Sequence, residues 1–136
     1  MLVQRIDRRV LHGDIHRHHM LQLVVEQPHI AIRANRQHWI LATKLANPMG
    51  KDPNRAGLSR KWVLQAAEES LKRLGTDTID IYYLHKEDHA TPLAETVRAM
   101  GDLIRQGKAR YFGVSNYRAW RVAEICNICD GLGIDR

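Results

Sequence analysis

Long apolar runs and cysteines are both scarce in this sequence of 136 residues. No stretch of about 18 uncharged apolar residues occurs, so we expect neither a transmembrane helix nor a membrane partner. The first ten residues, MLVQRIDRRV, have neither the apolar run nor the small-residue cleavage site of a secretory signal. Only two cysteines are present, which excludes a framework of several disulfides and leads us to expect a cytoplasmic protein.

The two cysteines, Cys126 and Cys129, have the C-x-x-C spacing of some redox and zinc sites. A structural zinc site needs four ligands, and the sequence contains no second pair of cysteines. The apolar residues around them have the spacing of a helix face, on which a cysteine packs as a small hydrophobic residue. We therefore interpret both cysteines as core residues and predict no metal site.

The net charge of +6 raises the question of a nucleic-acid-binding role. Residues 1–38 hold six Arg and three acidic residues, whereas residues 39–136 hold fifteen Lys or Arg and twelve acidic residues. The positive excess is therefore the same in both parts, and the second part mixes charges of both signs along its expected helices. Because no basic stripe emerges, we expect no nucleic-acid partner.

Three short apolar runs after residue 38 have the composition of buried strands. The first is Trp39–Thr43, which precedes a polar loop rich in Pro and Gly. The second run, Ile79–Leu84, is β-branched and aromatic, and the third is Ala109–Val114. These runs predict three strands.

Helix signals lie between and after these runs. Ser59 is a suitable N-cap for a first helix, and Gly75 is a suitable stop. A second helix is predicted to begin with Thr91 as N-cap and Pro92 as its first residue. The third helix is predicted near Ala119–Cys129.

The regular alternation of strand and helix implies a parallel sheet with helical crossovers. The G-x-G-x-x-G motif of a doubly wound dinucleotide-binding sheet is absent, so a segment of a barrel fits better. A complete (β/α)₈ barrel needs roughly 250 residues, about twice the length of this chain. We therefore expect an α/β fold, a partial (β/α)₈ TIM barrel with about three βα units, over residues 39–136.

Residues 1–38 form an atypical segment with a different composition. They contain six of the eight histidines, most of them in HGDIHRHH at 12–19, and one apolar stretch, LQLVV at 21–25. A His-rich tract can bind metal. His12, His16 and His19 would share one face of a helix, but Gly13 argues against a helix there. Because the tract is rich in histidine, a metal-binding module remains an alternative role for this segment.

Polar residues directly follow each of the three predicted strands: Lys44, His85 and the pair Ser115–Asn116. In a (β/α)₈ enzyme the functional groups lie at the carboxyl ends of the strands. Taken singly, each residue has a simpler explanation, because Lys44 fits a solvated loop and Ser115–Asn116 fits a helix N-cap. Their repetition at three successive strand ends favours a functional site.

The chain from about Arg36 onward resembles the aldo-keto reductases, particularly the branch that includes the potassium-channel β-subunits. The resemblance rests on the order and spacing of four motifs: WILATK at 39–44, GLSRKWV at 57–63, ESLKRLGTDTIDIYYLH at 69–85 and TPLAETVRAMGDLIRQGKARYFGVSN at 91–116. It implies that the three strands are the third, fourth and fifth of the barrel, with their helices.

The resemblance also implies an activity, the NADP(H)-dependent reduction of aldehydes and ketones to alcohols. Lys44 matches the lysine that lowers the pKa of the proton-donating tyrosine. His85 matches the histidine that hydrogen-bonds the carbonyl oxygen of the substrate. Ser115 and Asn116 match the pair that binds the nicotinamide carboxamide. The implied catalytic residues are therefore Lys44 and His85, and the implied cofactor-binding residues are Ser115 and Asn116.

The sequence departs from the family pattern at both ends. No tyrosine occurs in a motif like D-T-A-x-x-Y-G, and the nearest echo, IDRRVLHG, has His12 in the place of the tyrosine. The later strands, which bind the phosphates of the cofactor, have no counterpart before Arg136. We therefore expect a truncated reductase with impaired activity and weak or no binding of NADPH by the isolated chain.

Two alternatives concern the partners of the chain. A reductase would take a small carbonyl substrate, whereas a non-catalytic half-barrel would act as an interaction or self-associating module. Three parallel strands with unpaired edges and apolar helix faces need a cover. A homodimer would supply that cover, so we expect one.

Overall fold

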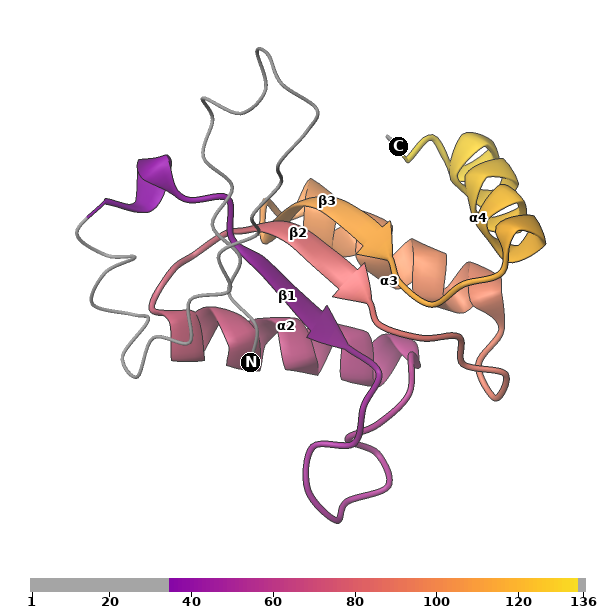
Figure 1. Cartoon of the computed structure of the whole chain (residues 1–136), viewed down its shortest axis with the longest axis horizontal. Helices are drawn as coiled ribbons and strands as arrows, with labels where there is room; N and C mark the ends of the chain where they lie inside the picture. The colour runs from indigo at the N-terminus through magenta and orange to yellow at the C-terminus, as the bar shows by residue number, and fades with distance from the viewer. Residues whose placement is uncertain (1–34, 135–136) are drawn as a thin grey trace, which may run out of the picture.

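The computed structural model of the protein describes residues 35–134 (Figure 1). Three strands form a parallel sheet in the order β1-β2-β3, with β1 at Ala42–Leu45, β2 at Ile79–Leu84 and β3 at Ala109–Val114. A helix follows each strand, and the three helices are α2 at Arg60–Leu74, α3 at Leu93–Arg105 and α4 at Ala119–Leu132. A short 3₁₀ helix, η2, precedes β1 at Arg36–His38. The predicted βα alternation and parallel sheet are confirmed.

The first strand differs from its prediction. The sequence placed it at Trp39–Thr43 with Lys44 beyond its end, whereas β1 begins at Ala42 and contains Lys44. Side chains satisfy the backbone just before it, because Arg36 donates to the carbonyl of Trp39 and the amide of Leu41 donates to a distant carboxylate, that of Asp80. The carbonyl of Leu41 already accepts from the amides of Asp80 and Ile81 over 2.9 and 3.0 Å, and the regular parallel register begins at the next residue, Ala42.

The helix boundaries agree with the sequence in part. Ser59 caps α2 by accepting a hydrogen bond from the amide of Trp62, and Gly75 ends it in the left-handed conformation. The prediction for α3 was wrong by one residue, because Pro92 is the N-cap. The hydroxyl of Thr91 does not cap this helix but donates to Asp88 over 2.8 Å. The third helix, α4, extends beyond its predicted end to Leu132.

The main core lies between the sheet and helices α2 and α3, and its largest fully buried side chains are those of Trp62, Tyr82 and Leu41. A second cluster joins α3 to α4 through Val97, Ile125 and Cys129. Cys129 is 1% exposed and Cys126 is half-buried, as expected for residues that pack in a core.

Two findings concern the described part of the chain as a whole. None of the helices within residues 35–134 is long and apolar enough to cross a membrane. Over the same residues, no group of three or more His, Cys, Asp or Glu side chains is arranged to hold a metal ion. The histidines at 12–19 and the LQLVV stretch at 21–25 lie outside the described residues.

Candidate active site

The residues that the sequence singled out lie along the carboxyl edge of the sheet. Lys44 is half-buried near the end of β1, and His85 directly follows β2, where its amide donates to the carbonyl of Leu45 over 3.0 Å. Ser115 directly follows β3, and its amide donates to the carbonyl of Leu84 over 2.9 Å. The parallel register therefore brings the three strand ends side by side, as the sequence predicted.

Asn116 connects two of these strand ends. Its side-chain amide donates to the carbonyl oxygen of His85 over 2.7 Å and contacts the hydroxyl of Ser115 over 3.2 Å. Its φ angle of 58° lies in the left-handed region, which asparagine tolerates better than most residues. The ends of β2 and β3 are thus fastened to each other by a side chain of the predicted site.

The simpler N-cap explanation of Ser115–Asn116 does not hold in the structure. Helix α4 begins at Ala119, its N-cap is Arg118, and no side chain of its own loop caps it by a hydrogen bond. Ser115 and Asn116 therefore lie outside the helix terminus, and their polar groups face the strand ends.

His85 has a polar neighbour from the loop after β1. The side-chain amide nitrogen of Asn47 lies 3.0 Å from Nδ1 of His85. An amide NH₂ group can only donate, so Nδ1 must accept and the neutral ring carries its proton on Nε2. This contact favours the Nε2–H tautomer of His85, and no signal in the sequence indicated it.

Lys44 contacts an aromatic ring on the same face of the sheet. Its ammonium nitrogen lies 5.8 Å from the centroid of the Tyr83 ring, within the range of a cation–π interaction. Tyr83 is opposite both Lys44 and Gly113 in the strand register. A Cβ at Gly113 would lie 2.6 Å from Cε1 of Tyr83, so glycine is what allows the ring to lie over β3.

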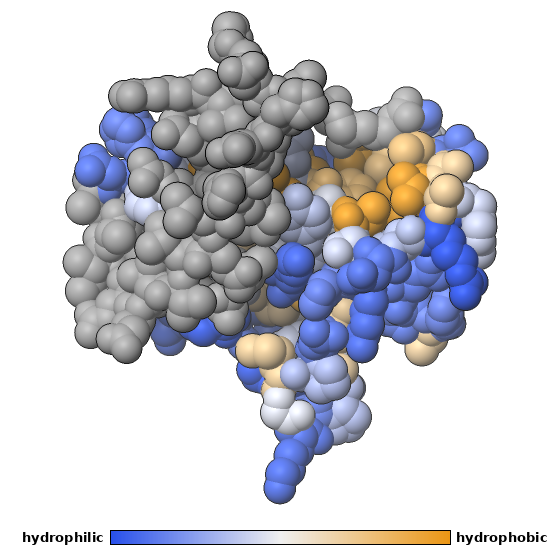
Figure 2. Space-filling view, viewed as in Figure 1, coloured by the Kyte–Doolittle hydropathy of each residue, from blue (hydrophilic) through white to orange (hydrophobic). Residues whose placement is uncertain are grey.

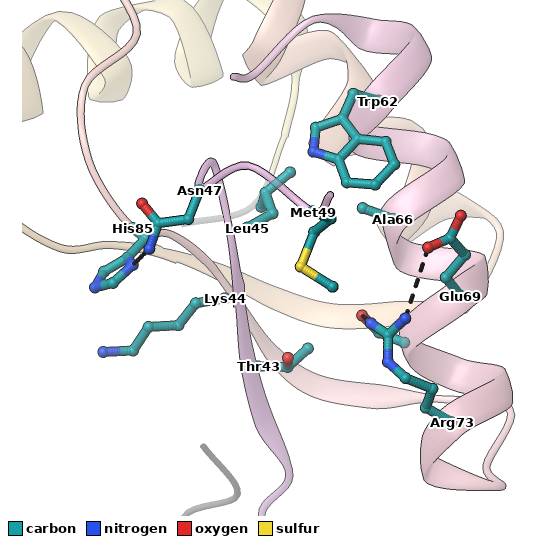
Figure 3. Close-up of a pocket in the computed structure, with 11 residues that line it drawn as sticks. Thr43, Lys44, Leu45, Asn47, Met49, Trp62, Ala66, Glu69, Arg73 and His85 are labelled. Carbon is teal, nitrogen blue, oxygen red and sulfur yellow. Dashed lines mark hydrogen bonds and ion pairs between the residues drawn. The ribbon is translucent and has the colours of Figure 1, made fainter. Parts of the chain in front are cut away.

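A cavity of about 460 Å³ lies on the other side of β1, against α2 (Figure 3). Lys44 and His85 border it, but the Lys44 side chain points away from α2 in Figure 3. On the α2 side, Glu69 forms an ion pair with Arg55 over 2.7 Å. A hydrogen bond from Gln65, with a hydrogen bond from Arg55 and the charges of Arg55 and Arg73, lowers the pKa of Glu69. The α2 side of the cavity is thus stabilised by contacts among Arg55, Gln65 and Glu69. The predicted site residues Lys44 and His85 lie at its border.

Comparison with known proteins points to one family. The profile of the Aldo/keto reductase family matches residues 13–132. The chain is 52% identical over 66 residues to human aldo-keto reductase family 7 member A3, over 48% of this chain and 20% of that protein. It is 42% identical over 85 residues to a probable voltage-gated potassium channel subunit beta of Arabidopsis thaliana, over 62% of this chain and 26% of that protein.

A bacterial relative matches a longer segment. L-glyceraldehyde 3-phosphate reductase of Escherichia coli K12 is 37% identical over 95 residues, which cover 70% of this chain and 28% of that protein. The chain thus spans about a quarter of the length of these curated relatives. The resemblance stated from the sequence motifs, including that to the potassium-channel subunits, is confirmed.

Proposed function

Because this chain belongs to the aldo/keto reductase family, we propose that it acts in the NADP(H)-dependent reduction of a small aldehyde or ketone. The observation that supports this proposal is that hydrogen bonds connect His85, at the end of β2, to the residues that follow β1 and β3. The backbone carbonyl of His85 accepts from Asn116, and its ring accepts from Asn47. A site at the carboxyl edge of a parallel sheet is where enzymes of this architecture carry their reactive groups.

His85 is the group that we propose contacts the carbonyl oxygen of the substrate. With Nδ1 engaged by Asn47, the Nε2 proton of His85 is available as a hydrogen-bond donor. A donor fixed before the reaction stabilises the negative charge that develops on the oxygen. Lys44 adds a positive charge on the neighbouring strand; the matching lysine of this family lowers the pKa of a proton-donating tyrosine, and this sequence has no tyrosine in the corresponding motif.

The pair Ser115–Asn116 suits the carboxamide of a nicotinamide. That group needs one hydrogen-bond donor and one acceptor. Asn116 uses its NH₂ group on His85 and Ser115, which leaves its carbonyl oxygen to accept, and the Ser115 hydroxyl can donate. The residues therefore fit this end of the cofactor, which supplies the hydride when bound. The match covers only part of the relatives, so we expect weak binding by this chain alone.

The test of this proposal is a titration with NADPH by calorimetry. We expect Asn116→Ala to weaken binding about tenfold, because one uncharged hydrogen bond of ~1.5 kcal/mol is removed. Asn127→Ala is the matched control, since Asn127 is exposed on α4. Absence of NADPH binding by the wild-type chain, or equal effects of the two variants, would refute the proposal. Lys44→Met should leave cofactor binding intact.

We propose self-association as a second role, on the basis of two observations. The sheet order leaves one edge of β1 and one edge of β3 unpaired within the described residues. Apolar surface also gathers between β3 and α4 in Figure 2, and Tyr111 on β3 is 58% exposed. A homodimer in the cytoplasm would cover these features. Light scattering tests this role, and a monomer at all concentrations would contradict it.

A further inference from the structure

The loop after β2 carries two adjacent carboxylates, Glu87 and Asp88, just beyond His85. Each of them accepts a hydrogen bond from the backbone of a different neighbouring loop. Asp88 accepts from the amide of Leu58, at the end of the β1–α2 loop, over 2.7 Å. Glu87 accepts from the amide of Arg118, at the end of the β3–α4 loop, over 3.0 Å. One loop is therefore tied to the loops on both sides of it.

The environment of Asp88 is built around its carboxylate. Besides the Leu58 amide, it accepts from the amide of Ala90 over 2.9 Å and from the hydroxyl of Thr91 over 2.8 Å. Burial acts to raise the pKa of Asp88, but these hydrogen bonds outweigh it and lower the pKa. Gly57 allows the close approach, because a Cβ there would lie 2.7 Å from Oδ2 of Asp88. Asp88 is thus held in its ionised form.

The contact of Asp88 extends to Asn47 through the base of the β1–α2 loop. The amide of Gly57, next to Leu58, donates to the carbonyl of Ala46 over 3.0 Å and closes this base. Ala46 has a φ angle of 110°, which is strained for a residue with a Cβ and persists only where its surroundings hold it. Asn47 is the next residue, and it contacts His85.

Glu87 holds the β3–α4 loop through the amide of Arg118. Its side chain is only 9% exposed, and the ring of His89 lies 3.6 Å from its second oxygen. Arg118, which donates to Glu87, is the N-cap of α4, where a negative charge is favourable. The segment between β3 and this anchor contains Ser115 and Asn116.

We propose that Glu87 and Asp88 are positioning residues that hold the two flanking loops around His85. Asp88 fixes the loop that places Asn47 against the imidazole ring, and Glu87 fixes the loop that places Asn116 against the backbone of His85. Neither carboxylate contacts the reacting atoms. The effect of these two residues on NADPH binding and reduction rests on the proposed function. Their effect on the tautomer of His85 and on the two loops does not.

The experiment is NMR spectroscopy of the full chain, with ¹⁵N labelling of the backbone and of the histidine rings. In Asp88→Ala, we expect the exchange rate of the Leu58 amide proton to rise at least about tenfold, as for the loss of a charged hydrogen bond. The ¹⁵N shifts of His85 should also move from those of a single Nε2–H tautomer toward a mixture. In Glu87→Ala, the Arg118 amide should exchange faster while the His85 tautomer stays unchanged.

The conservative variants separate positioning from general loss of structure. Glu87→Gln keeps the oxygen that accepts from the Arg118 amide and should restore most of the wild-type behaviour, even if an alanine variant fails to fold. Asp88→Asn keeps one acceptor oxygen for Leu58 and Thr91 but turns its NH₂ group toward the Ala90 amide, so it should restore the Leu58 contact and the His85 tautomer in part. Asp77→Ala is the control, because Asp77 is exposed in the turn before β2. An unchanged His85 tautomer in both Asp88 variants, or equal changes in the Asp77 control, would overturn the proposal.

Binding of NADPH distinguishes this proposal from the function on which it rests. If the wild-type chain binds, Glu87→Ala should weaken binding severalfold and Asp88→Ala should leave it nearly unchanged, since only Glu87 holds the Ser115–Asn116 loop. If the wild-type chain does not bind, the proposed function fails, and the shifts of His85 alone then support or overturn the positioning role.

Discussion

Replacing Gly113 by alanine should destabilise the protein through the ring of Tyr83. The added Cβ would lie 2.6 Å from Cε1 and 2.8 Å from Cδ1 of that ring. Carbon atoms prefer separations of about 3.5–4.0 Å, so the ring or the strand must move by about 1 Å. Overpacking of this kind costs roughly 1–3 kcal/mol. Alanine recovers about 0.5–1 kcal/mol of that loss because glycine is unfavourable within a strand.

We therefore expect the free energy of unfolding to fall by about 1–2 kcal/mol in Gly113→Ala, as measured by urea denaturation. The matched control is Gly131→Ala, in α4, where an added Cβ meets no atom within 4 Å. The same chemical change should stabilise the protein there by up to about 1 kcal/mol, because alanine is the better helix former. The two substitutions should thus have opposite signs.

A double-mutant cycle locates the cause in the ring. In a Tyr83→Ser background the clash is absent, so Gly113→Ala should cost little or become stabilising. A loss of stability of the same size with and without the ring would refute the reasoning. So would a Gly113→Ala variant as stable as the wild type.

Three further predictions concern single polar groups. The Tyr82 hydroxyl is buried without a hydrogen-bond partner among residues 35–134, so Tyr82→Phe should raise the unfolding free energy by about 1 kcal/mol, and a decrease in urea denaturation would contradict this. Burial, with the charges of the loop after β2, raises the pKa of Tyr117 to about 12. Stability present below pH ~10, the unfolded value, should therefore be lost as the pH rises to about 12, and Tyr117→Phe should reduce this loss in thermal scans at high pH. Asn47→Asp replaces the donor to Nδ1 of His85 by an acceptor, so the ring proton should move to Nδ1 or the ring should become charged. The ¹⁵N shifts of the His85 ring measure this, and an unchanged Nε2–H tautomer would show that Asn47 does not set it.

The second and third strands could be predicted from the sequence because their signals are local. Ile79–Leu84 is rich in β-branched and aromatic residues, Ala109–Val114 lies between the stop of one helix and the start of the next, and the structure has both strands with these bounds. The start of the first strand could not be predicted in this way. The amide of Leu41, just before it, donates to the carboxylate of Asp80, which lies 39 residues away in the sequence. The predicted N-cap at Thr91 was wrong for a related reason, because the hydroxyl of Thr91 is hydrogen-bonded to the carboxylate of Asp88.

The candidate site shows the same division between local and distant causes. Lys44, His85 and the pair after β3 could be found because each follows an apolar run in the sequence. Asn47 and its neighbours in the other loops could not, since their roles arise from contacts between residues 30 or more positions apart. Only the folded chain brings these partners together. The roles of the four predicted site residues stay predictions until ligand binding is measured.

The closed base of the β1–α2 loop separates its tip from the sheet. The tip, from Gly50 to Asn54, projects from the rest of the molecule in Figure 1 and is exposed. Closing a longer loop costs only about 0.6 kcal/mol for each doubling of its length. Insertions at the tip should thus be well tolerated, and evolution or an engineer can vary this stretch to suit different small molecules without moving the imidazole.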